Sequence, residues 1–170
     1  GGPDGAPFPA STGIQCRSGE EECVVDVLAV EPLRPGAITV EPVRASPRQD
    51  QSFNYGSAFS RGMTLAVDGK RTIHISGTAS INPAGDSTHI GDAECQSLET
   101  MMSIAAILEQ QGGTLRNITS ATLFCKTHEA WEAWCRVSRL LQIPFFPKVA
   151  VLADVCRDNL LVEMEVVAVI

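Results

Sequence analysis

The sequence predicts an α+β domain in which two helices cover one face of a single sheet. Two observations carry this prediction: strand-like and helix-like runs alternate from about residue 56 to residue 170, and each helix-like run joins two strands in the order β-β-α-β-α-β-β. Because crossover connections are right-handed, both helices fall on one face of the sheet and leave the other bare. A bare, partly apolar face has to be buried by self-association or by packing on a second, similar domain.

Residues 1–55 precede this domain and are predicted to form an arm that packs against it, as the remnant of an upstream domain would. The arm opens with a run rich in glycine, proline and small residues, as expected of a linker or a processed end. Two strand-like runs follow, Cys23–Val30 and Ala37–Val43, and the turn-forming stretch EPLRPG separates them. We therefore expect two short strands and linkers over residues 1–55 and the main domain over residues 56–170.

The main domain begins with a predicted β-hairpin. The runs MTLAVD and RTIHISGTASI flank a turn signal in which Gly69 and Lys70 follow Asp68. Small and polar residues alternate with apolar or small ones along the second strand, so one of its faces is predicted to be polar. The residues of that polar face are His74, Ser76, Thr78 and Ser80.

Two helices and three further strands are predicted after the hairpin. Asp92 can cap the first helix, which Gly112 and Gly113 end. The predicted apolar stripe of this helix contains Cys95, Leu98, Met101, Met102, Ala105 and Leu108. The second helix spans His128–Leu141 and ends at IPFFPK, and its tryptophans, Trp131 and Trp134, are interpreted as core residues. The remaining strands are Ile118–Cys125, Lys148–Cys156 and Leu160–Ile170.

The last strand carries two carboxylates in an otherwise apolar run, LLVEMEVVAVI. Because strand side chains alternate, one face is wholly apolar and the other carries Glu163 and Glu165. A carboxylate placed there costs desolvation energy unless it faces water, a basic partner or a ligand. A solvated face or a salt bridge to a neighbouring subunit would explain the pair. Cys156 and Arg157 lie just upstream, however, and a thiol and a guanidinium so close to these acids favour a functional site.

Composition excludes several classes of function. The formal net charge of −7 argues against a nucleic-acid surface, because phosphate binding needs clustered lysine and arginine. No apolar run approaches the ~20 residues of a membrane span, and no signal peptide opens the chain. We therefore expect a cytoplasmic protein that does not associate with a membrane. The six cysteines lack zinc-site spacing, so we expect no metal site and mostly buried free thiols. Cys16 and Cys23 would pair only in an oxidising setting.

Several motifs, taken as a set, resemble the Rid superfamily, also called the YjgF or endoribonuclease L-PSP family, over roughly residues 50–170. They are FSRG at Phe59–Gly62, ISGTASI at Ile75–Ile81, ILEQQGGTLRNI, ATLFC and VEMEVVAV. The chorismatase branch is the most similar, because PASTGI at Pro9–Ile14, SPRQ at Ser46–Gln49 and DVCRDNLLVEME resemble its elements. Chorismatases carry an additional N-terminal domain, so the chain resembles the C-terminal catalytic part of such a protein.

This resemblance implies a chorismate-mutase-like fold, a homotrimer or pseudo-trimer with ligand clefts between subunits, and no cofactor. Glu163 matches the acid that positions or protonates the substrate, and Arg61 and Arg157 match positions that hold its carboxylate. Lys148 stands where Rid deaminases have an arginine, and a lysine cannot form the same bidentate fork. Phe59 stands where many of those deaminases have a tyrosine.

Two further residues are candidates for ligand contact. Cys156 would shape the pocket or act as a nucleophile, although a buried spectator thiol is favoured over these roles because the sequence shows no activating base. Thr78 would offer a hydroxyl to a ligand, or is small because the centre of a trimer is tightly packed.

The leading functional hypothesis is therefore a cofactor-independent hydrolase that acts on a small carboxylate metabolite, such as chorismate or a similar enolpyruvyl compound, in a cleft between subunits. The alternatives are an imine or enamine deaminase of the RidA type, which Lys148 and Phe59 disfavour, and a non-catalytic metabolite-binding subunit. A nuclease follows only from the family's older name, and the acidic charge opposes it.

Overall fold

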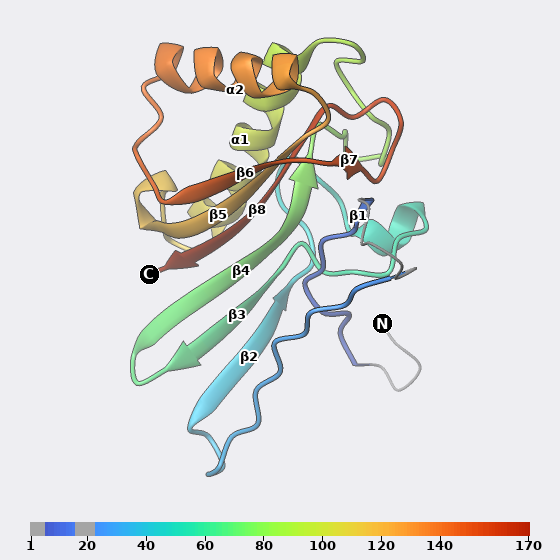
Figure 1. Ribbon diagram of the computed structural model, residues 1–170. Coiled ribbons are helices and arrows are strands. Elements are labelled where there is room, and N and C mark those ends of the chain that lie inside the picture. Colours follow the sequence, from blue (N-terminus) through green and yellow to red (C-terminus); the bar gives the residue numbers. More distant parts are fainter. Residues whose placement is uncertain (1–5, 16–22) are drawn as a thin grey trace.

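One six-stranded sheet forms the centre of the protein (Figure 1). The structure is a computed structural model that describes residues 6–15 and 23–170. The strands lie in the order β2-β3-β4-β8-β5-β6, and only the outer pair β5 and β6 is parallel. They are β2 (Ile38–Val43), β3 (Gly62–Val67), β4 (Lys70–Ala79), β5 (Ile118–Cys125), β6 (Lys148–Leu152) and β8 (Val162–Val169). Two short strands, β1 (Ile14–Gln15) and β7 (Asp154–Val155), pair in a separate antiparallel sheet.

Two helices cover one face of the main sheet, as predicted (Figure 1). Helix α1 (Ala93–Gln110) packs on β4 and β8, and α2 (His128–Leu140) packs on α1 and β5. Asp92 caps α1 by accepting a hydrogen bond from the backbone N–H of Cys95 at 2.9 Å, which confirms the predicted cap. The short 3-10 helices are η1 (Ser52–Tyr55) and η2 (Leu115–Asn117). No helix in the described part of the chain is both long and apolar enough to cross a membrane.

The core lies between these helices and the sheet. The predicted apolar face of β8 is confirmed, since Val162, Met164, Val166 and Ala168 are all buried. The predicted stripe of α1 is partly wrong. Its buried side is centred on Met101, Ile104 and Leu108, whereas Met102 keeps 42% of its surface exposed. Apolar residues occur around most of this helix, so their spacing alone does not fix which side is buried.

The hairpin between β3 and β4 forms as predicted, but a β-bulge then changes which residues share a face. Asp68 and Gly69 both adopt positive φ values, 49° and 78°, as a tight hairpin turn requires. The register with β8 shifts between Ile75 and Thr78, so Thr78 pairs with Met164 on the helix-covered face. The prediction that Thr78 shares a face with His74 is therefore wrong, because the bulge inserts one residue between them.

Two strand predictions in the flanking segments need correction. Strand β2 confirms the run Ala37–Val43, but Cys23–Val30 forms no strand, and Val24, Val25, Val27 and Leu28 are each more than 70% exposed. A strand needs a hydrogen-bonding partner, and this run has none within the described residues. The expected strand Lys148–Cys156 is divided, because β6 ends at Leu152 and β7 pairs with β1 instead.

The cysteines are less buried than expected. Cys125 is buried, Cys95 and Cys135 are half-buried, and Cys23 and Cys156 are exposed. Cys16 lies outside the described residues, so the conditional pairing with Cys23 stays a prediction. The exposure of Cys156 follows from its position beyond β7, where the chain has left the main sheet.

Candidate functional site

Glu163 is buried near the start of β8, on the face of the sheet that the helices leave uncovered. Only 3% of its surface is exposed. Its cross-strand neighbours are Ala79 on β4 and Phe124 on β5, and both are apolar. Glu163 is therefore neither solvated nor on the helix-covered face, and the solvated-face alternative does not explain it.

The bulge in β4 provides the space for this carboxyl group. A Cβ atom at Gly77 would overlap Oε1 of Glu163 and would lie 3.1 Å from its Cδ. The same Cβ would lie 2.9 Å from the methyl carbon of Thr12, in the N-terminal segment. Glu163 and Thr12 thus share the space above Gly77, which only a residue without a side chain leaves open.

A thiol and a guanidinium lie beside Glu163. The Sγ atom of Cys156 donates to Oε2 of Glu163 across 3.8 Å. Burial raises the pKa of Glu163 to about 7, and the thiol and the nearby charge of Arg157 only partly oppose this rise, while Glu165 adds to it. Partial burial and the Glu163 charge raise the pKa of Cys156, so its thiol is a proton donor here and not a thiolate nucleophile.

The raised pKa of Glu163 predicts a pH-dependent stability. Between its ordinary value of 4.5 and about 7, the folded protein holds a proton that the unfolded chain releases. This contribution is complete below about 4.5 and is lost as the pH rises through about 7, by on the order of 3 kcal/mol. Urea unfolding of the wild-type chain and Glu163→Gln, from about pH 5 to about pH 8, should show this loss in the wild type alone. If the free energy of unfolding changes with pH equally in both proteins, the pKa assigned to Glu163 is wrong.

Arg61 forms a second cationic centre and is itself buried, with 1% of its surface exposed. Its Nε and Nη2 atoms donate to the carbonyl of Asp50 at 3.1 and 2.9 Å, and Nη2 also donates to the hydroxyl of Tyr55. The guanidinium carbon lies 5.4 Å from the ring centre of Tyr55 and 5.2 Å from that of Phe59. Phe59 therefore contributes a ring face that supports Arg61.

Tyr55 connects the two cationic centres and is the site residue that the sequence analysis missed. The guanidinium carbon of Arg157 lies 5.9 Å from the Tyr55 ring, and Nη1 of Arg157 donates to the carbonyl of Gly85. Gly85 in turn packs against the Tyr55 ring. Burial raises the pKa of Tyr55 despite the two nearby cations. The available signal was that Tyr55 is the only tyrosine and lies in a polar linker.

Neither Arg61 nor Arg157 has a carboxylate partner in the described part of the chain. The ion pairs there join Arg48 to Glu99, Lys126 to Asp154, and Arg136 to Glu94 and Glu132. A buried guanidinium without an acidic partner loses hydration that a bound anion can replace. The arrangement can therefore hold a carboxylate beside a protonated acid, Glu163.

Two predicted site residues lie elsewhere in this chain. Lys148 is on β6, and its Nζ lies 4.9 Å from the ring centre of Trp134 and 5.3 Å from that of Phe146, on the helix side of the sheet. Thr78 donates its hydroxyl to the carbonyl of Ser76 at 2.8 Å and is 1% exposed. The structure thus places Cys156 and Arg157 near Glu163, and Tyr55 connects Arg157 to Arg61 and its neighbour Phe59. Lys148 and Thr78 lie outside that group.

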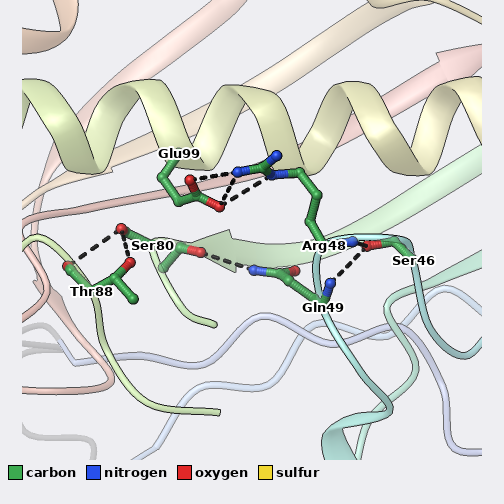
Figure 2. A network of polar contacts seen from close by, with 7 residues as sticks. Ser46, Arg48, Gln49, Ser80, Thr88 and Glu99 are labelled. Atoms are coloured by element: carbon green, nitrogen blue, oxygen red, sulfur yellow. Dashed lines mark hydrogen bonds and ion pairs between the residues drawn. The ribbon is translucent and has the colours of Figure 1, made fainter. Parts of the chain in front are cut away.

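A second polar network fixes the segment that leads to Tyr55 (Figure 2). Arg48 forms a bidentate ion pair with Glu99 on α1, at 2.8 and 2.9 Å. Gln49 is fully buried and donates to the carbonyl of Ala79 at 3.0 Å. Ala79 is the cross-strand neighbour of Glu163. The SPRQ stretch thereby attaches the Tyr55 segment to the strand that carries Gly77.

The Glu163 carboxyl is closed off from solvent in the single chain, since only 3% of the residue's surface is exposed. A cavity of about 60 Å³ lies nearby, and Phe59 lines it together with Phe8 and Phe53, but Glu163 does not. Within residues 6–15 and 23–170, no group of three histidine, cysteine or acidic side chains is arranged to hold a metal ion. Access to Glu163 therefore requires a movement of the covering residues or an approach through a neighbouring subunit.

Residues 57–170 match the family model described as endoribonuclease L-PSP. The fold is also similar to several solved structures. A chorismatase aligns with a TM-score of 0.59 and 20% identity over 77% of this chain and 43% of its own. The YjgF gene product of E. coli aligns with a TM-score of 0.60 and 20% identity over 76% of this chain and 98% of its own. RidA from an Antarctic Psychrobacter aligns with a TM-score of 0.59 and 19% identity over 78% of this chain and 98% of its own. This chain spans less than half the length of that chorismatase, and at these identities the similarity shows a shared fold.

Proposed function

Since the chain belongs to the endoribonuclease L-PSP family, also called the Rid superfamily, we propose that it is a cofactor-independent hydrolase of a small carboxylate metabolite. The substrate is chorismate or a similar enolpyruvyl compound. One observation carries the proposal. A buried acid with a pKa of about 7, Glu163, lies near the guanidinium of Arg157, and the Tyr55 ring connects that guanidinium to the one of Arg61. Neither guanidinium forms an ion pair among the described residues.

Glu163 is suited to act as a general acid at neutral pH. With a pKa of about 7 it holds a proton that an ordinary carboxyl group would have lost. That proton passes to the methylene carbon of the enolpyruvyl group, and water then adds to the adjacent carbon that bears the ether oxygen. The added water returns a proton to Glu163. The resulting hemiketal divides into pyruvate and an alcohol as its hydroxyl proton passes to the departing ether oxygen, and Glu163 is already protonated for the next turnover.

Arg61, Arg157 and Tyr55 are proposed to bind and orient the substrate. The two guanidinium carbons lie 5.4 and 5.9 Å from the centre of the Tyr55 ring, and the groups can receive a carboxylate. Cys156 is placed to hold the Glu163 carboxyl in one orientation through its thiol. Holding the substrate carboxylate near the acid converts proton transfer into an intramolecular step.

Arg157→Lys should weaken substrate binding more than it slows the chemical step. Lysine keeps the positive charge but loses the planar fork that binds both carboxylate oxygens. We expect KM to rise by about 10- to 150-fold, as loss of one charge-assisted hydrogen bond costs about 1.5–3 kcal/mol. Steady-state kinetics measure the effect. The matched control is Arg136→Lys, because Arg136 lies on α2 and forms an exposed ion pair away from the site. An unchanged KM for Arg157→Lys would remove this residue from the binding group.

We also propose a homotrimer, or pairing with a related domain, and a cytoplasmic location. Val149, Val151 and Leu152 on the edge strand β6 expose 64%, 37% and 51% of their surfaces, and burial between subunits would remove them from water. Residues 1–55 act as an arm on the domain formed by residues 56–170. Light scattering after size exclusion measures the assembly directly.

The deciding experiment follows pyruvate release from chorismate by a chain of confirmed oligomeric state. Release at a rate far above background supports the hydrolase. Absence of release, with ammonia release from 2-aminoacrylate, supports the deaminase and overturns the proposal. Absence of both, with saturable carboxylate binding seen by calorimetry, identifies a metabolite-binding subunit.

A further inference from the structure

An N-terminal segment, residues 8–15, crosses the uncovered face of the sheet directly above Glu163. The backbone N–H of Ser60 donates to the carbonyl of Pro9 at 2.8 Å, and its hydroxyl donates to the carbonyl of Phe8 at 2.6 Å. The N–H of Ser11 donates to the hydroxyl of Ser76 at 3.0 Å. Strand β1 then pairs with β7, next to Cys156. Hydrogen bonds therefore hold the segment both before and after the point at which it passes Glu163.

Thr12 is the residue of this segment that shares the space above Gly77 with Glu163. The N–H of Gly77, which the bulge releases from the ladder with β8, donates to Oγ1 of Thr12 at 3.0 Å. This bond turns the methyl group of Thr12 towards the space that Glu163 Oε1 also occupies above Gly77. Thr12 itself is half-buried, while Glu163 is 3% exposed. The threonine methyl thus forms part of the apolar cover of the acid.

We propose that Thr12 is a positioning residue for Glu163, whose methyl group keeps water from the carboxyl and whose hydroxyl fixes the covering segment to Gly77. This role of Thr12 rests on the proposed function only in experiments that measure turnover. The other groups that face Glu163 are uncharged, or their effect on its pKa has been described above. They are Ala79 on β4, Phe124 on β5, Cys156 and Arg157 after β7, and Glu165 on β8 itself. Thr12 differs from these groups because its methyl group and its hydroxyl can be removed separately, by substitutions that add no charge.

A matched pair of variants separates the two parts of the threonine side chain. Thr12→Ser removes the methyl and keeps the hydroxyl, whereas Thr12→Val keeps a methyl and removes the hydroxyl. Water reaching the carboxyl in Thr12→Ser should lower the pH of half-ionisation of Glu163 by on the order of one pH unit. Thr12→Val should keep that pH raised and lower thermal stability, because the Gly77 N–H loses its acceptor.

The ionisation of Glu163 is followed by ¹³C NMR of the glutamate side-chain carboxyls, with Glu163→Gln identifying the signal. Thr39→Ser, at an exposed position on β2, is the control and should leave the titration unchanged. An unaltered titration in Thr12→Ser, or an equal shift in Thr12→Val, overturns the proposal. Because this readout needs no substrate, a shift seen without chorismate turnover keeps the role of Thr12 and rejects the hydrolase.

Discussion

Glu163→Gln should lower kcat for chorismate hydrolysis by about 10²- to 10⁴-fold, the range that a general acid contributes. Glutamine has nearly the same shape and fills the same buried position, but it cannot deliver a proton to the enolpyruvyl methylene. The wild-type rate should fall as the pH rises through about 7, because Glu163 is then ionised. Pyruvate release measures both effects, and the variant should lack this alkaline limb.

The control for this substitution is Glu41→Gln, which removes an exposed carboxylate from β2 and should retain full activity. Both variants are compared with the wild type at matched oligomeric state. If folded Glu163→Gln releases pyruvate as fast as the wild type, Glu163 is not the acid, and the proposed mechanism fails. A rate that rises through pH 7 would instead indicate a base.

Most of the fold could be predicted because its signals are local. Asp92 announces the start of α1, and Asp68 with Gly69 forms the hairpin turn through its positive φ values. The bulge at Ser76–Gly77 could not be predicted, because strict alternation continues through it in the sequence. It is an effect of pairing with β8, and it moved Thr78 to the opposite face from the one expected.

The candidate site could be predicted where chemistry and sequence position coincide. Glu163, Cys156 and Arg157 are close in the sequence. A turn between β7 and β8 is therefore enough to bring them together in space. Tyr55 and Thr12 approach through tertiary contacts with Arg61 and Gly77, and no local pattern announces such contacts. Lys148 was assigned from resemblance alone, and the fold of this chain turns its ammonium group towards Trp134.

Gly77→Ala should lower kcat/KM by about 10²-fold, since displacing a catalytic group by about 1 Å has effects of this size. The new Cβ would occupy the position of Oε1 of Glu163 and approach the Thr12 methyl to 2.9 Å. The carboxyl is at the end of a flexible side chain and can rotate away, so we expect a folded protein with a misplaced acid. Overpacking should still cost about 1–3 kcal/mol of unfolding free energy.

Gly13→Ala is the matched control for this glycine, because a Cβ there meets no atom within 4 Å. It lies in the same covering segment, and we expect it to retain both activity and stability. Kinetics and urea unfolding of the two variants therefore separate a change in Glu163 placement from a general effect of adding a methyl group. If Gly77→Ala matches Gly13→Ala in activity, the carboxyl works from another orientation, and the close packing of Glu163 against Gly77 has no part in the reaction.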